Sequence, residues 1–132
     1  MKSMKKIILL GITYLLLSAS FAHSQSTVTF RVNVSYEIEN GLFNPEEHTV
    51  QLLGNVHPLS MNREITMTPN DSDSTTYEVD VRFPIDVVRQ PLNYRFRLEL
   101  DRRYMNEDVP RNMVIPNQSA KLDAIYFNSF AW

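Results

Sequence analysis

The chain has 132 residues, about the length of one domain, with 43% apolar residues and no cysteine. The apolar fraction excludes an intrinsically disordered chain, and the lack of cysteine excludes disulfide scaffolds and thiolate metal sites. Residues 1–24 carry three lysines and no acid, so residues 25–132 hold 10 basic and 15 acidic side chains, a net charge of −5. This acidic balance argues against a nucleic-acid-binding surface.

The first segment has the layout of a secretory signal peptide. Lys2, Lys5 and Lys6 precede an apolar run over residues 7–17, and small residues follow the run. The run is too short for a membrane anchor, which takes about 20 residues. No cysteine follows it to carry a lipid. We therefore expect an exported protein with a leader of bacterial type and no membrane insertion once the leader is removed.

The cleavage position is expected after Ala22 or after Ser24. The second position is favoured because a strand pattern begins almost at once, at Thr27. Residues 1–24 are thus predicted to be the signal peptide and residues 25–132 to be one domain, periplasmic or extracellular.

Alternation of apolar and polar residues predicts β-strands over most of this domain. The predicted strands are residues 27–35, 49–53, 64–68, 76–83, 92–100, 113–115 and 121–127. Turns rich in proline and asparagine separate them, and residues 36–43 and 86–90 each hold one helical turn at most. Seven short strands predict an all-β fold, an antiparallel β-sandwich.

The strands at residues 76–83 and 92–100 leave their pairing open. As antiparallel neighbours they would set Glu78 opposite Arg97, an attractive cross-strand pair. The connector between them contains two prolines and is equally suited to carry the chain from one sheet to the other. The pairing is therefore a hypothesis at this point.

Motifs of catalysis are absent from the sequence. There is no Gly-x-Ser-x-Gly elbow, no His-Glu-x-x-His pair and no glycine-rich phosphate loop. His48 and His57 are the histidines outside the leader, and neither has the sequence context of a nucleophile's base. The chain is predicted not to be an enzyme and to need no cofactor.

Metal sites are not predicted either. Glu46, Glu47 and His48 are adjacent, and on an extended chain they would point to opposite sides. Residues 70–75 have the polar composition of a calcium loop but lack its central glycine and its final glutamate. A polar turn between two strands explains them better.

The order of several short segments resembles a known family. They are VTFRVNV at 28–34, GLFNP at 41–45, VQLLGN at 50–55, YEV at 77–79, LNYRFR at 92–97 and VPRN at 109–112. This order is similar to that of the starch-binding-like modules of bacterial secreted proteins, which are related to carbohydrate-binding module family 20 and to the glycogen-binding modules. The resemblance covers residues 27–128 and implies an immunoglobulin-like β-sandwich.

The resemblance also implies a sugar site. In this family an aromatic ring stacks on the apolar face of a glucose ring, while amides and carboxylates bind its hydroxyls. The first family tryptophan, expected shortly after Gly54, is absent, and Tyr104 matches the second tryptophan region. Glu107 and Asn112 fall near the family's acid and asparagine. Tyr104, Glu107 and Asn112 are thus the predicted ligand-binding residues.

Two functions follow from these expectations. The first is an exported carbohydrate-binding module for an α-glucan or a related polysaccharide or oligosaccharide. The alternative is a protein-interaction module of the same fold that lost the sugar site and docks a secreted or periplasmic partner through a sheet edge or an aromatic patch.

Overall fold

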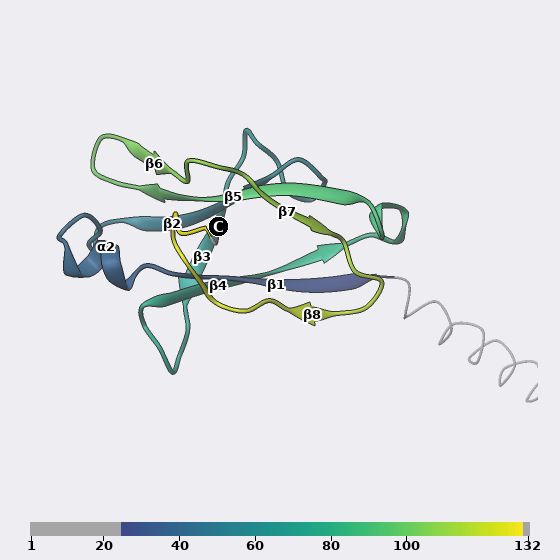
Figure 1. The fold of residues 1–132 in the computed structure, drawn as a ribbon, viewed down its shortest axis with the longest axis horizontal. Helices are drawn as coiled ribbons and strands as arrows, with labels where there is room; N and C mark the ends of the chain where they lie inside the picture. The colour runs from purple at the N-terminus through teal and green to yellow at the C-terminus, as the bar shows by residue number, and fades with distance from the viewer. Residues whose placement is uncertain (1–24, 131–132) are drawn as a thin grey trace, which may run out of the picture.

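The part of the chain that the structure describes forms nine β-strands, arranged in two layers that face each other across an apolar core (Figure 1). The computed structural model describes residues 25–130, so the predicted signal peptide and its cleavage position lie outside the described residues. The strands are β1 (Ser26–Asn33), β2 (Thr49–Gly54), β3 (Ile65–Pro69), β4 (Thr76–Phe83), β5 (Pro91–Glu99), β6 (Tyr104–Asn106), β7 (Arg111–Val114), β8 (Ala120–Lys121) and β9 (Ile125–Tyr126). The helical segments are α2 (Ser35–Glu39) and the 3-10 turn η2 (Ile85–Val87). The all-β sandwich predicted from the sequence is confirmed.

The first layer, here the β1 layer, is built on β1. This strand pairs antiparallel with β4 along its full length, and β8 and β9 pair with its other edge in parallel orientation. These two parallel pairings are a departure from the purely antiparallel sandwich that was expected.

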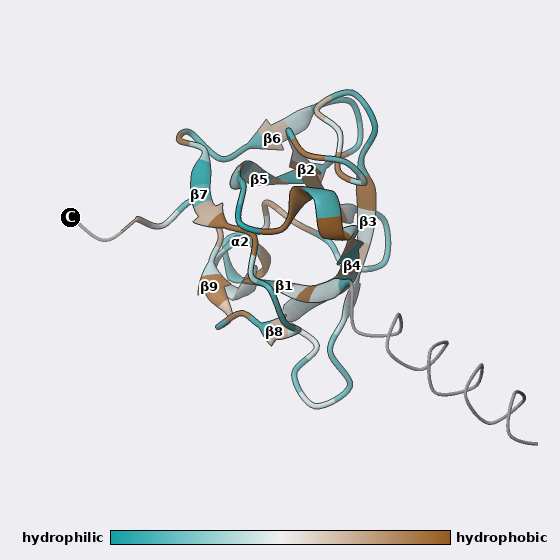
Figure 2. Ribbon diagram, turned by 90° about the vertical axis from the view of Figure 1, so that its right-hand side faces the viewer, coloured by the Kyte–Doolittle hydropathy of each residue, from teal (hydrophilic) through white to brown (hydrophobic). Residues whose placement is uncertain are grey.

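The second layer, here the β5 layer, is built on β5. On one edge β5 pairs with β2, and on the other it pairs with β7 near its start and β6 near its end. Strand β3 joins the layers, because residues 65–67 pair with β2 while Thr68 and Pro69 pair with β4. Figure 2, which looks along the strands, shows β3 at the side of the sandwich where the layers meet.

The pairing hypothesis for β4 and β5 is wrong. The two strands lie in different layers, joined by a connector that contains η2. Glu78 pairs instead with Arg31 on β1, at 3.3 Å, and Arg97 donates a hydrogen bond to Gln51 on β2. Both strands bury an apolar face, so facing each other across the core removes more apolar surface from water than lying side by side.

Aromatic side chains join the two layers in the core. Phe30 of β1 packs edge-to-face against Phe83 of β4 and against Tyr94 of β5, with ring centroids 6.4 and 5.0 Å apart. Tyr94 in turn packs edge-to-face on Phe96. Such contacts add to the burial of apolar area, so packing holds the layers together in a chain without cysteine.

Candidate functional site

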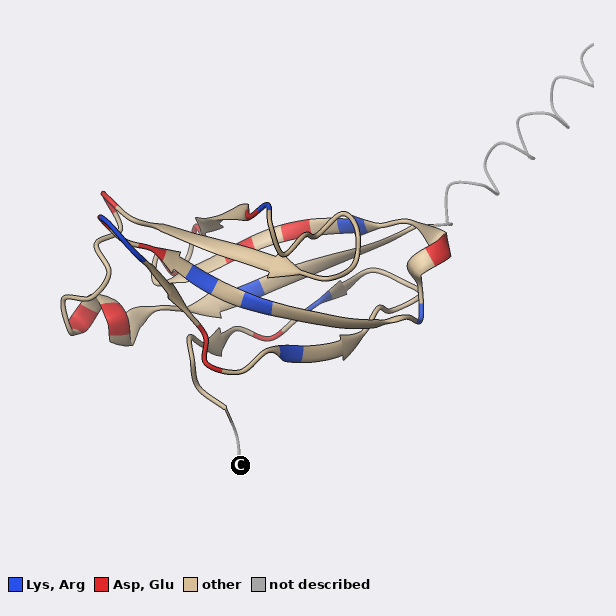
Figure 3. Cartoon of the chain, turned by 90° about the horizontal axis from the view of Figure 1, so that it is seen from above, with Lys and Arg blue, Asp and Glu red and all other residues tan. Residues whose placement is uncertain are grey.

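The outward face of β5 carries an ordered row of polar side chains. Alternate residues of β5 point inward and are buried, which leaves Arg97 and Glu99 on the solvent side. Arg97 Nε donates to Gln51 Oε1 at 2.8 Å, and Gln51 Nε2 donates to Glu99 Oε2 at 2.6 Å. Figure 3, seen from the side of the β5 layer, shows basic and acidic positions mixed along this face. The side chains here are held in place before any ligand arrives.

Tyr104 lies at the edge of this face. Strand β6 places it opposite Glu99, and 55% of its surface is exposed. The Arg97 guanidinium lies 3.9 Å from the centroid of the tyrosine ring, a cation–π contact that restrains the ring. A depression of about 240 Å³, lined by residues 99–104, adjoins the ring. The structure therefore presents the predicted stacking residue at the surface, in a fixed orientation.

Asn112 lies on the same outward face but at its other end. Strand β7 pairs Asn112 with Asn93, while Tyr104 pairs with Glu99. Six residues along an extended strand correspond to about 20 Å. The structure thus places these two predicted ligand-binding residues on one face without bringing them into one subsite.

Glu107 lies in the interior and is 1% exposed. Its carboxylate accepts hydrogen bonds from the backbone N–H of Phe96 at 3.1 Å and of Asn128 at 2.8 Å. It also forms an ion pair with Arg111, whose Nε lies 2.9 Å from Oε1. The carboxylate therefore ties β5, β7 and the C-terminal segment together beneath the surface, and it does not share the outward face with Tyr104 and Asn112.

Glu47, His48 and Asp101 lie close together and are the residues to examine for a metal site, which the sequence did not predict. Their ligand atoms lie within 4.8 Å of one another. His48 Nδ1 accepts the backbone N–H of Asn44 at 2.9 Å, so in the neutral ring the proton sits on Nε2, 3.0 Å from Asp101 Oδ1. A metal ligand needs an unprotonated nitrogen, so the arrangement fits a histidine–aspartate hydrogen bond better than a metal centre.

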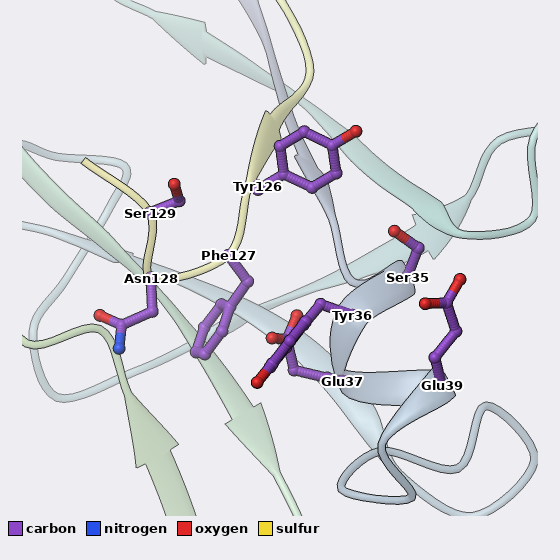
Figure 4. A pocket seen from close by; sticks show the side chains of 8 residues that line it. All are labelled: Ser35, Tyr36, Glu37, Glu39, Tyr126, Phe127, Asn128 and Ser129. Carbon is purple, nitrogen blue, oxygen red and sulfur yellow. The ribbon is translucent and has the colours of Figure 1, made fainter. Parts of the chain in front are cut away.

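A groove that sequence analysis missed lies between α2 and the chain that follows β9 (Figure 4). Its volume is about 630 Å³. The lining residues are Ser35, Tyr36, Glu37, Glu39, Tyr126, Phe127, Asn128 and Ser129. Tyr36 and Tyr126 are 61% and 60% exposed, which makes them the most exposed tyrosines of the described residues.

The parallel pairing of β9 with β1 builds this groove. It places Tyr126 beside Asn33, and the backbone N–H of Phe127 donates to Asn33 O at 2.9 Å. Helix α2 begins two residues after Asn33, whose side-chain oxygen accepts the N–H of Ser35. Residues about 90 positions apart thus lie side by side, because two residues of β1 pair with the two residues of β9. So short a pairing produces no periodic pattern from which it could be predicted.

Comparison with solved structures shows a similarity to a glucoamylase from Hormoconis resinae, with a TM-score of 0.55 and 12% sequence identity. The similarity covers 83% of this chain, and the chain spans only 18% of the glucoamylase chain. At this identity the likeness shows a shared fold. No family model matches the sequence, and no curated protein matches it.

The described residues 25–130 contain no helix of the length and apolar character that a membrane crossing requires.

Proposed function

We propose that the protein is an exported, non-catalytic module that binds an α-glucan or a related oligosaccharide on the outward face of its β5 layer. The observation that carries this proposal is the Tyr104 ring, more than half exposed and restrained by the Arg97 guanidinium at 3.9 Å. A pyranose ring has an apolar face that stacks on such an aromatic ring, and a ring already fixed in place loses little entropy on binding.

Two further observations support the same class of ligand. The residues beside Tyr104 offer hydrogen-bonding groups of both kinds: carboxylate oxygens at Glu99 and Asp101, and guanidinium donors at Arg102 and Arg103. The fold is also shared with part of a glucoamylase, in agreement with the resemblance to starch-binding-like modules. In this proposal Asn112 serves a more distant unit of an extended glycan, and Glu107 acts by holding β5 and β7 in place.

The test is binding of the purified protein to soluble starch and to maltooligosaccharides, measured by affinity electrophoresis and calorimetry. Tyr104→Ala is expected to weaken binding about five- to thirtyfold, because stacking of one ring contributes about 1–2 kcal/mol. Tyr104→Trp is expected to keep or strengthen binding. Tyr126→Ala removes an equally exposed tyrosine elsewhere and is the matched control.

Unchanged binding in Tyr104→Ala would contradict the assignment of the ring. If the protein bound no glycan at all, the proposal would fail, and the protein-interaction module of the same fold would be favoured.

A further inference from the structure

The groove between α2 and the C-terminal segment has one sign of charge. Glu37 and Glu39 line it, and its eight lining residues include no lysine, arginine or histidine. The nearest basic group that the contacts reveal is Arg111, whose Nη2 donates to the backbone oxygens of Tyr126 and Ser129. That guanidinium is neutralised by its ion pair with Glu107. The groove therefore favours a cationic ligand over an anionic one.

Glu37 has a buried carboxylate oxygen without a hydrogen-bond donor among the described residues. The residue is 5% exposed, and its Oε1 accepts no hydrogen bond from any part of the chain that the structure describes. A buried acceptor without a donor destabilises the fold, and a carboxylate does so more than a neutral group. Glu37 is nevertheless one of the residues that line the groove, as Figure 4 shows. A ligand that brings a charged donor would satisfy its carboxylate.

The two exposed tyrosines suit the same kind of ligand. The face of a phenol ring attracts an ammonium group, and carboxylates beside such rings add to that attraction. Ser35, Asn128 and Ser129 add hydroxyl and amide groups that can bind hydroxyls. A small polyhydroxylated amine matches both the charge and the polar groups of the groove.

We propose that this groove binds an amino sugar with a free, protonated amine, with the ammonium directed to Glu37 and the sugar ring against Tyr36 and Tyr126. The site goes beyond the proposed function, because Tyr104 and the outward face of the β5 layer take no part in it. The groove is built on β1 and β9, whereas Tyr104 belongs to β6 in the other layer.

The direct test is calorimetry of the purified protein with three probes of equal length: a glucosamine oligomer, its fully N-acetylated form and a neutral maltooligosaccharide. The glucosamine oligomer is expected to bind in the groove. N-acetylation is expected to weaken that binding at least tenfold, because it removes the charge that Glu37 recognises.

Variants then locate the site. Glu37→Gln and Tyr126→Ala are each expected to weaken glucosamine binding about tenfold. Glu46→Gln removes an equal charge from an exposed position outside the groove lining and is not expected to change glucosamine binding. Tyr126→Ala lies on the surface, so the test stands even if Glu37→Gln fails to fold.

Several results would overturn this assignment. One is that the N-acetylated oligomer binds as tightly as the glucosamine oligomer, and another is that Glu46→Gln weakens binding as much as Glu37→Gln does. A lysine peptide that bound as tightly as the glucosamine oligomer would show a general attraction of cations. Loss of starch binding in Tyr104→Ala with intact glucosamine binding would separate the two sites. Failure of one proposal therefore leaves the other standing.

Discussion

At the scale of single residues, the two buried carboxylates of the described residues, Glu107 and Glu37, differ in their hydrogen bonds. Glu107 has its oxygens bonded by Arg111 and by two backbone N–H groups. Glu37 has an oxygen without a donor among the described residues, and desolvation by burial raises the pKa of its carboxyl above the ordinary value of 4.5. The first is a stabilising group, and the second is a destabilising one that a ligand could use.

Glu37→Gln is expected to raise the free energy of unfolding at pH 7 by about 1 kcal/mol, because it removes a poorly solvated charge. A raised pKa means that the folded state binds the proton more tightly than the unfolded state. The penalty is therefore fully present above the folded-state pKa and disappears as the pH falls through it toward 4.5. Urea denaturation of both proteins at a series of pH values should show their difference shrinking toward zero below pH 4.5.

The exposed neighbour on the same helix supplies the control for this prediction. Glu39→Gln is expected to change the free energy of unfolding by less than about 0.5 kcal/mol at every pH. A Glu37→Gln protein that is less stable than the wild type at pH 7 would show that the carboxylate has a partner that stabilises it.

At the scale of elements, the sequence predicts strands well where they are long enough to alternate. Strands β1, β4 and β5 have eight or nine residues each and lie within a residue or two of the predicted bounds. Strand β6 was missed, because its three residues are too few to show a period. The predicted strand at residues 121–127 is really the two-residue strands β8 and β9 with a break between them.

The neighbours of each strand could not be predicted from the sequence. Period-two alternation states which face is buried, but it does not state which strand lies alongside, as the wrong pairing of β4 with β5 shows. The same limit explains the candidate sites. Tyr104 was predicted from a family resemblance and is exposed, whereas the groove depends on the pairing of β9 with β1, which no pattern specifies.

The C-terminal segment is joined to the β5 layer by Glu107, which leads to a prediction about stability. Glu107→Gln would leave the Arg111 guanidinium without an anionic partner. The Arg111 side chain is only 12% exposed, so water cannot fully replace that partner. Breaking a buried ion pair on one side costs about 3–5 kcal/mol. Urea denaturation should show a loss of about 3 kcal/mol.

Asp123→Asn is the matched control for that variant, because it neutralises an exposed acid in the same C-terminal region. Its expected effect is less than about 0.5 kcal/mol. A loss below about 1 kcal/mol in Glu107→Gln would show that the ion pair contributes little and that the segment is held by its backbone hydrogen bonds.

At the scale of the whole molecule, two layers without a disulfide depend on the core between them. The buried side chains come from both layers, with Phe30 and Phe83 from one and Leu92 and Phe96 from the other. Both candidate sites lie on the outside of this core, on different layers. The core therefore fixes the relative position of the two sites. Its contribution to stability can be tested with variants that touch neither site.

Phe30 is the residue that tests the core most directly, because its ring touches aromatic rings of both layers. Phe30→Ala is expected to lower the free energy of unfolding by about 3–5 kcal/mol, through lost apolar burial and the cavity left behind. Since a domain of this size is stable by about 5–15 kcal/mol in all, thermal denaturation should show a much lower midpoint. Val114→Ala, at an exposed apolar position, should shift the midpoint little. If the two variants melted alike, the layers would be held together by contacts other than the aromatic core.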